Sequence, residues 1–161
     1  MAFRLEVNGV DDLIRKMDKI ADKGVECASL ALYEGARVTA DAVGGAVENI
    51  ATEPFRYAGS GQKRKPSPEE KAVLTGAKHG VAKFRKGITK VDTSVGYQNS
   101  GYGQINGKTV PVPLVANAIN SGTSFMQKQP FIRKAFSQSK GAAEAAIENK
   151  LREELEKLSA D

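Results

Sequence analysis

Few side chains in this sequence could support catalysis or bind a metal ion. His79 is the only histidine and Cys27 the only cysteine among 161 residues. A single histidine cannot build a His-based zinc cluster, and its lysine-rich neighbourhood favours an exposed histidine without a catalytic role. Cys27 follows Glu26, and a neighbouring carboxylate disfavours the reactive thiolate. We therefore predict no catalytic residue, no cofactor and no metal site, and we expect that the protein is not an enzyme.

Positive charge is the strongest chemical feature of the chain, and it is concentrated in one segment. The whole chain has a formal net charge of +5. From Arg56 to Lys90 there are ten lysines or arginines against two acids, Glu69 and Glu70, so this segment carries +8 and the rest of the chain −3. A local excess of this size is typical of a surface that meets phosphates or acidic proteins.

Six cations of this segment are the candidate partner-binding residues: Lys63, Arg64, Lys65, Lys83, Arg85 and Lys86. With the aromatic residues nearby they could hold nucleic acid through phosphate contacts and stacking. No helix-turn-helix, RRM or KH pattern surrounds them. Two other interpretations therefore stay open, a solvated loop without a partner and a loop that becomes ordered on a protein partner.

The spacing of apolar residues predicts the elements of the N-terminal half. Residues 3–7 alternate apolar and polar side chains, as in a half-buried strand. Apolar residues three and four apart then predict two N-terminal helices, the first from Asp11 or Asp12 to Gly24 and the second from residue 25 to about 50. The second helix carries small residues on its apolar side, which predicts close packing against a neighbour.

Residues 52–87 differ in composition from the segments on either side. They contain prolines, glycines and the basic run, with few bulky apolar side chains. This composition predicts a long mobile basic loop, and loops of such length are usually functional or disordered. Inside it, the sequence SPEE at 67–70 predicts a short helix that runs through Leu74, because proline fits the first helical turn and acids favour a helix N-terminus.

Strand patterns return in the second half of the chain. Residues 88–97 alternate β-branched and polar side chains, which predicts one strand. Asn106-Gly107 is a strong signal for a two-residue turn, so residues 102–105 and 108–110 should pair as a hairpin.

Two further helices and the joint between them complete the pattern. Residues 114–120 predict a short helix that ends at Gly122, and Pro130 is placed to open a long helix that reaches about Leu158. The segment between these helices holds no acid, base or metal ligand. We predict that it is a rigid structural joint. Its candidate residues are Gly122, Thr123, Ser124, Pro130, Phe131 and Arg133.

The order and spacing of these blocks resemble a known family, the small neck proteins of long-tailed bacteriophages. These are the head-tail joining or tail-completion minor structural proteins of lambda-like siphophages and prophages. The similarity covers residues 3–158 apart from the loop at 52–87. The blocks that carry it are Val7, Gly9, Val10 and Leu13, then Val95-Gly96-Tyr97, the helix and Gly-Thr-Ser turn at 116–124, and the Pro-Phe-x-Arg opening at 130–133.

The resemblance implies a structural virion protein at the head-tail interface. It would form or join a homo-oligomeric ring, with a hexamer as one candidate, that completes the tail and allows the filled head to attach. The implied partners are copies of itself, a neighbouring connector or stopper protein, and a tail-tube or tail-terminator protein, with DNA passing nearby and no membrane. The implied location is the virion neck or tail, and the host cytoplasm before assembly. The alternative is a basic nucleic-acid-binding protein that acts through residues 56–90.

Together these elements predict one α+β domain over residues 1–161. A small, mostly antiparallel sheet would be packed by two N-terminal helices and a long C-terminal helix, with the long basic loop at 52–87 as its partner-binding part. The joint would fix the direction of the last helix. In a ring-forming protein such a fixed angle decides whether identical contacts between neighbouring subunits close.

Overall fold

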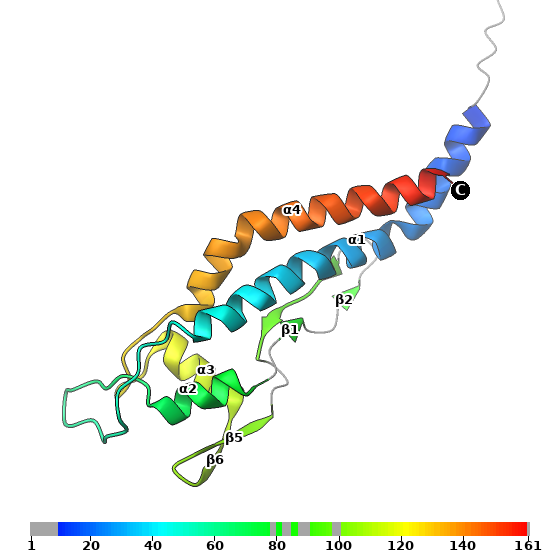
Figure 1. Ribbon diagram of the computed structural model, residues 1–161. Helices are drawn as coiled ribbons and strands as arrows, with labels where there is room; N and C mark the ends of the chain where they lie inside the picture. The colour runs from blue at the N-terminus through cyan, green and yellow to red at the C-terminus, as the bar shows by residue number, and fades with distance from the viewer. Residues whose placement is uncertain (1–9, 78–79, 82–84, 87–90, 98–100, 161) are drawn as a thin grey trace, which may run out of the picture.

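The fold is organised around two long helices that lie side by side (Figure 1). The computed structural model describes residues 10–77, 80–81, 85–86, 91–97 and 101–160. Helix α1 spans Val10–Val47 and helix α4 spans Phe131–Ala160. At about 1.5 Å per residue these helices are roughly 57 and 45 Å long. Two short helices and three antiparallel strand pairs complete the described part, which confirms the predicted α+β class.

The N-terminal half contains one helix where the sequence predicted two. Gly24 does not end a helix, and the Gly44-Gly45 pair lies inside α1 as well. A glycine in a helix interior costs only about 1 kcal/mol relative to alanine, and most of a helix's stability in a protein comes from tertiary packing. Contacts with α4 along much of its length therefore outweigh the local stop signal. The predicted strand at 3–7 lies outside the described residues.

Small side chains allow α1 and α4 to approach closely. A row at every fourth residue of α1 is buried: Cys27, Ala31, Gly35, Thr39 and Val43. A Cβ atom added to Gly35 would lie 2.5 Å from Cγ1 of Ile147 on α4. Real Cβ contacts are not this short, so the two helices pack through a position that has no side chain. The predicted close packing of this helix is confirmed.

The strands form three separate antiparallel pairs. β1 (Gly80–Val81) pairs with β4 (Val95–Gly96), and β2 (Arg85–Lys86) pairs with β3 (Val91–Asp92). The single strand predicted at 88–97 is therefore wrong within its described part, because residues 93–94 separate two strands that have different partners. Residues 87–90 lie outside the described chain.

The third pair is the hairpin that the sequence predicted. β5 (Tyr102–Ile105) and β6 (Lys108–Pro111) are joined by Asn106 and Gly107, which have φ angles of 48° and 72°. Two residues with positive φ form the turn whose twist suits a two-residue hairpin. Helix α3 (Val112–Ser121) follows directly and ends before Gly122, so the predicted short helix is also confirmed.

Residues 64–75 belong to the segment predicted as a long mobile loop, but they pack into the fold, and the short helix predicted inside that segment is confirmed. Helix α2 spans Pro68–Thr75, and its Leu74 is only 1% exposed. The residue before the helix, Ser67, is equally buried. The composition of the segment is polar, but the fold buries the few apolar side chains that it has.

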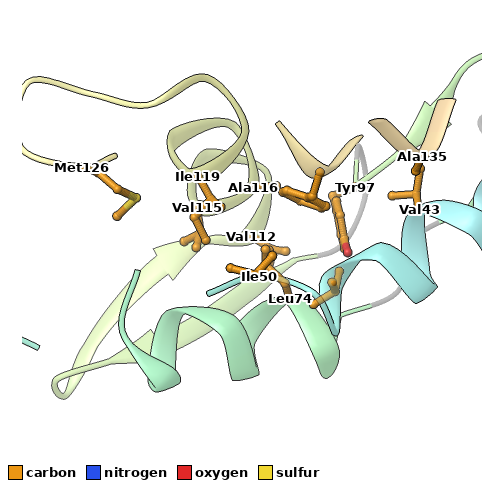
Figure 2. Close-up of a cluster of buried hydrophobic side chains, with 12 residues drawn as sticks. Val43, Ile50, Leu74, Tyr97, Val112, Val115, Ala116, Ile119, Met126 and Ala135 are labelled. Carbon is orange, nitrogen blue, oxygen red and sulfur yellow. The ribbon is translucent and has the colours of Figure 1, made fainter. Parts of the chain in front are cut away.

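The core lies where α2 and α3 meet the adjoining ends of α1 and α4 (Figure 2). Its side chains come from every helix and from the segments between them. They are Val43, Val47, Ile50, Leu74, Tyr97, Val112, Val115, Ala116, Ile119, Met126, Phe131 and Ala135. Phe131 anchors the start of α4 as predicted, whereas Phe136 is half exposed and does not. No helix in the described residues is both long and apolar enough to cross a membrane.

Candidate functional site

The three residues of the basic run have different environments. Arg64 is 4% exposed, whereas Lys63 and Lys65 on either side are exposed. The guanidinium of Arg64 donates two hydrogen bonds to the carboxylate of Glu70, at 2.7 and 2.6 Å. This planar two-bond geometry is the strongest form of an ion pair in proteins. Arg64 was predicted to bind a partner, but its guanidinium is buried and engaged by Glu70, so its role in the described structure is structural.

Glu70 is held in place by the start of α2. Its carboxylate accepts a hydrogen bond from the backbone N–H of Ser67 at 2.7 Å, and Ser67 Oγ accepts one from the N–H of Glu70 at 3.2 Å. This reciprocal capping box satisfies two backbone donors at the helix N-terminus. The carboxylate that helps to cap the helix thus also pairs with Arg64.

The charge of Glu70 is maintained despite its burial. Burial alone would raise the pKa of its carboxyl group, but the hydrogen bonds from Arg64 and Ser67 and the positive charge of Arg64 outweigh this effect and leave the pKa below its ordinary value. The hydrogen bonds to Glu70 raise the pKa of Arg64 in turn. Both groups are ionised at neutral pH, so the site contains a buried, fully charged pair.

Two aromatic rings pack against the guanidinium of Arg64. Its Cζ atom lies 4.9 Å from the ring centre of Phe55 and 5.9 Å from that of Phe125. A cation within about 6 Å of a ring centre is attracted by the ring's negative face. Arg64 therefore connects the segment after α1 to the segment before α4.

The backbone of Arg64 makes the same connection. Its N–H donates to the carbonyl of Phe125 at 2.9 Å, and its carbonyl accepts from the N–H of Gln127 at 2.8 Å. Arg64 and Met126 thus form an isolated parallel bridge. The basic run and the predicted joint, about sixty residues apart in the sequence, are parts of one site.

The Gly-Thr-Ser turn has the geometry of a tight reversal. Gly122 has a φ of 76°, which favours glycine, and its N–H donates to the carbonyl of Ala118 at 2.9 Å. Thr123 Oγ1 accepts from the N–H of Met126 at 3.0 Å, and the N–H of Thr123 donates to the carbonyl of Met126 at 3.1 Å. Ser124 is exposed. The first two residues of the turn therefore fix the backbone.

Two amide side chains fix the start of α4. Asn120 Oδ1 accepts from the N–H of Ile132 at 3.1 Å, in the first turn of α4. The side chain of Gln129 accepts from the N–H of Ala51 at 2.9 Å and donates to the carbonyl of Ala51 at 2.7 Å. Sequence reasoning missed both residues, since their partners are 12 and 78 positions away and no local motif indicates them.

The remaining predicted joint residues lie at the beginning of α4. Pro130 precedes the helix, and its carbonyl accepts from the N–H of Lys134 at 3.0 Å. Phe131 is buried in the core, while Arg133 is exposed. Proline suits this position because its missing N–H would have no helical partner. We call the whole arrangement the clasp: residues 51–70 and 120–132, with the Arg64–Glu70 pair at its centre.

The other predicted cations do not join Lys63 and Lys65. Arg85 and Lys86 form β2, which pairs with β3 and lies well away from the loop that follows α1 (Figure 1). Lys83 lies outside the described residues. The six candidate cations are therefore not gathered at one place in the described residues, and binding of a partner by Arg85 and Lys86 stays a prediction.

The clasp offers hydrogen bonds and charge but no set of groups for metal binding. In the described ranges, no three histidine, cysteine, aspartate or glutamate side chains gather closely enough to hold a metal ion. A separate apolar hollow of about 510 Å³ lies between α1 and α4, lined in part by Leu32, Phe136 and Ile147.

Comparisons with protein-family models, with curated proteins and with solved structures found no match.

Proposed function

We propose that the chain is a structural protein of the neck of long-tailed bacteriophages. In this role it forms or joins a homo-oligomeric ring, located in the virion neck or tail, that completes the tail and allows the filled head to attach. Before assembly it resides in the host cytoplasm. Its neighbours are a connector or stopper protein on one side and a tail-tube or tail-terminator protein on the other, and it catalyses no reaction.

The observation that carries the proposal is the clasp. Asn120 accepts a hydrogen bond from the first turn of α4, and hydrogen bonds of Gln129 and of the Arg64 backbone hold the segment before that helix, so the direction in which α4 leaves the core is fixed. A ring of identical subunits needs the same contact angle in every copy, because a small error per subunit leaves the ring open. A rigid joint that holds a helix about 45 Å long suits that requirement better than it suits a binding loop.

The apolar hollow between the long helices gives the proposal a second support. Phe136 is 50% exposed at its edge, and Leu32 and Ile147 are partly exposed. Apolar hollows that open to solvent are among the places where proteins bind partners. A neighbouring subunit of the ring would bury it.

The alternative, a nucleic-acid-binding protein acting through residues 56–90, loses part of its basis. Arg64 is the centre of the densest basic run, and its charge is neutralised by Glu70. A mobility-shift titration with duplex DNA separates the two functions. Binding at physiological salt that disappears when Lys63 and Lys65 become alanine would favour the alternative.

The decisive experiment is disruption of the gene in a phage that encodes it. We expect filled heads and separate tails in electron micrographs of the lysate, and joined particles when the purified wild-type chain is added. Normal joined particles from the disrupted phage would overturn the proposal. Native mass spectrometry of the purified chain, alone and with tails, would give the number of subunits.

Deletion of the whole basic segment cannot replace this experiment. Residues 59–86 include Leu74 of the core and the Arg64–Glu70 pair, so their deletion would unfold the clasp. Point substitutions at exposed positions are needed to separate docking from folding.

A further inference from the structure

Three aromatic rings form an exposed patch on the outer side of the clasp. Tyr57 is 89% exposed, Phe125 48% and Phe55 37%. Phe55 and Tyr57 meet edge to face with ring centres 5.4 Å apart, and both phenylalanine rings contact Arg64. We call Phe55, Tyr57 and Phe125 the aromatic patch. The loop that carries two of them protrudes at the end of the molecule opposite the C-terminus (Figure 1).

Hydrogen bonds hold the residues beneath the aromatic patch in place. The guanidinium that contacts both phenylalanine rings is itself fixed by two hydrogen bonds to Glu70, and the backbone on either side of Phe125 is tied to Arg64. A surface that is already ordered loses little conformational entropy when a partner binds. Exposed aromatic side chains on such a base have the composition of an interface hot spot.

The surroundings of the patch carry unbalanced positive charge. Lys63 and Lys65, on either side of Arg64, are exposed, and neither forms an ion pair with a described residue. Arg56, between the two aromatic residues of the loop, is paired with Glu53 at 3.2 Å. These two lysines therefore remain to attract negative charge over the screening distance of about 8–10 Å.

We propose that the aromatic patch is a docking surface for an acidic protein, one that presents aspartate or glutamate side chains around an apolar centre. The rings bury against that centre, and the lysines meet the carboxylates at the rim. The inference deepens the proposed function, since within the phage neck this partner would be a neighbouring structural protein. The inference is argued from the three aromatic rings and the neighbouring lysines, and these observations do not depend on a role in the phage neck.

The geometry of the aromatic side chains favours a protein as the partner over single-stranded nucleic acid. Proteins that bind single strands stack successive bases on open ring faces. Here one side of Phe55 and of Phe125 is occupied by Arg64, and the planes of Phe55 and Tyr57 lie at 81° to each other. Bases could not stack in sequence on rings arranged in this way.

Site-specific photo-crosslinking in the cell that encodes the chain tests this inference. The full-length protein would carry p-benzoylphenylalanine in place of Tyr57, and the crosslinked peptide would be identified by mass spectrometry. The matched control carries the same group in place of Tyr102, which is 74% exposed on the β5–β6 hairpin. We expect a crosslink from position 57, at least about tenfold stronger than from position 102, to an acidic segment of another protein.

Two further measurements link the crosslink to the proposed chemistry. The substitutions Lys63→Glu and Lys65→Glu together should lower the yield at least about tenfold, as should Phe125→Ala. Circular dichroism must show that each variant is folded. If a variant does not fold, the crosslink from position 57 of the otherwise unchanged chain is measured in cell lysate from about 0.05 M to about 0.5 M salt, where screening should weaken it.

Each outcome gives a decision. A crosslink to another copy of this chain, to nucleic acid, to a protein segment without acidic residues, or to nothing would overturn the inference. A salt-sensitive crosslink to an acidic protein that is not a virion component would support the inference and count against the proposed function. Head-tail joining is judged separately in the electron micrographs.

Discussion

Removing the charge of Glu70 should destabilise the protein more than any surface substitution. In Glu70→Gln the shape of the side chain is retained, but Arg64 loses its counter-charge while its side chain is only 5% exposed. Breaking a buried ion pair by removing one partner typically costs about 3–5 kcal/mol, because the other charge is left uncompensated. In a domain of this size that loss corresponds to a fall in Tm of roughly 10 °C.

The assay is guanidinium-induced unfolding followed by circular dichroism, with a matched control. Glu34→Gln removes a carboxylate that pairs with Arg37 on the surface of α1, where both side chains are at least one-third exposed. Such exposed pairs contribute about 0.2–1 kcal/mol, so the control should change little. A loss in Glu70→Gln no larger than that in Glu34→Gln would refute the reasoning.

A double substitution separates the ion pair from its burial. Arg64→Met combined with Glu70→Leu replaces both charges by apolar groups of similar size. Replacement of a buried pair in this way is often close to neutral. The cap that Glu70 provides for Ser67 would still be lost, at a cost of about 1 kcal/mol. We therefore expect the double variant to recover at least half of the stability lost in Glu70→Gln.

The same pair predicts how stability depends on pH. The folded-state pKa of Glu70 is depressed below its ordinary value of 4.5. Its contribution to the free energy of unfolding is therefore fully present above about pH 4.5 and is lost as the pH falls through the lower folded-state pKa. The wild type should lose stability in this acidic range more steeply than Glu70→Gln, in unfolding curves measured at successive pH values. Parallel curves would contradict this assignment.

Three further predictions follow from single positions. Gly35→Ala should cost about 1–3 kcal/mol in guanidinium unfolding, since its Cβ would lie 2.5 Å from Ile147 and force α1 and α4 apart. Gly122→Ala should cost about 1–2 kcal/mol in the same assay, because alanine disfavours a φ of 76°. Tyr97 should ionise late in an ultraviolet absorbance titration, since burial raises its pKa to about 12; stability should accordingly fall as the pH rises from about 10 towards 12.

Each of these predictions has a control in the same chain. A Cβ at Gly45, inside α1, meets nothing within 4 Å, so Gly45→Ala should be neutral or stabilising by up to about 1 kcal/mol. Gly59 has open space and no positive φ, so Gly59→Ala should change stability by less than about 0.5 kcal/mol. Tyr102→Phe should leave the late titration unchanged, whereas Tyr97→Phe should abolish it. If a variant and its control had equal effects, the physical reason given for that position would be contradicted.

The elements that could be predicted from the sequence are those determined by residues within a few positions of one another. The α2 helix was predicted from Pro68 and the two acids after it, and the structure adds a capping box at the same place; the hairpin follows from Asn106-Gly107. The end of α3 and the start of α4 follow from Gly122 and Pro130 in the same way. In each case one or two residues fix a backbone conformation that their neighbours can accept.

The features that could not be predicted depend on distant partners. Gly24 reads as a helix end, and only the contacts of α1 with α4 show why the helix continues. Arg64 stands between two lysines, and composition assigns all three to the same solvated loop. The side chain of Glu70 is six positions away across two prolines, and no periodicity connects it with Arg64. Counting charges along the sequence does not show which of them are paired and buried in the fold.

This difference between neighbouring cations changes what the basic segment can do. A flexible arm of lysines and arginines would attract any acidic surface, but it would hold none in a defined orientation. Here the central cation is fixed to Glu70 and to two aromatic rings, and the lysines on either side face solvent from that rigid base. Arg64 therefore contributes order and the lysines contribute attraction. Since the clasp also fixes the start of α4, a partner bound to the aromatic patch would be held at a defined angle to the long helices.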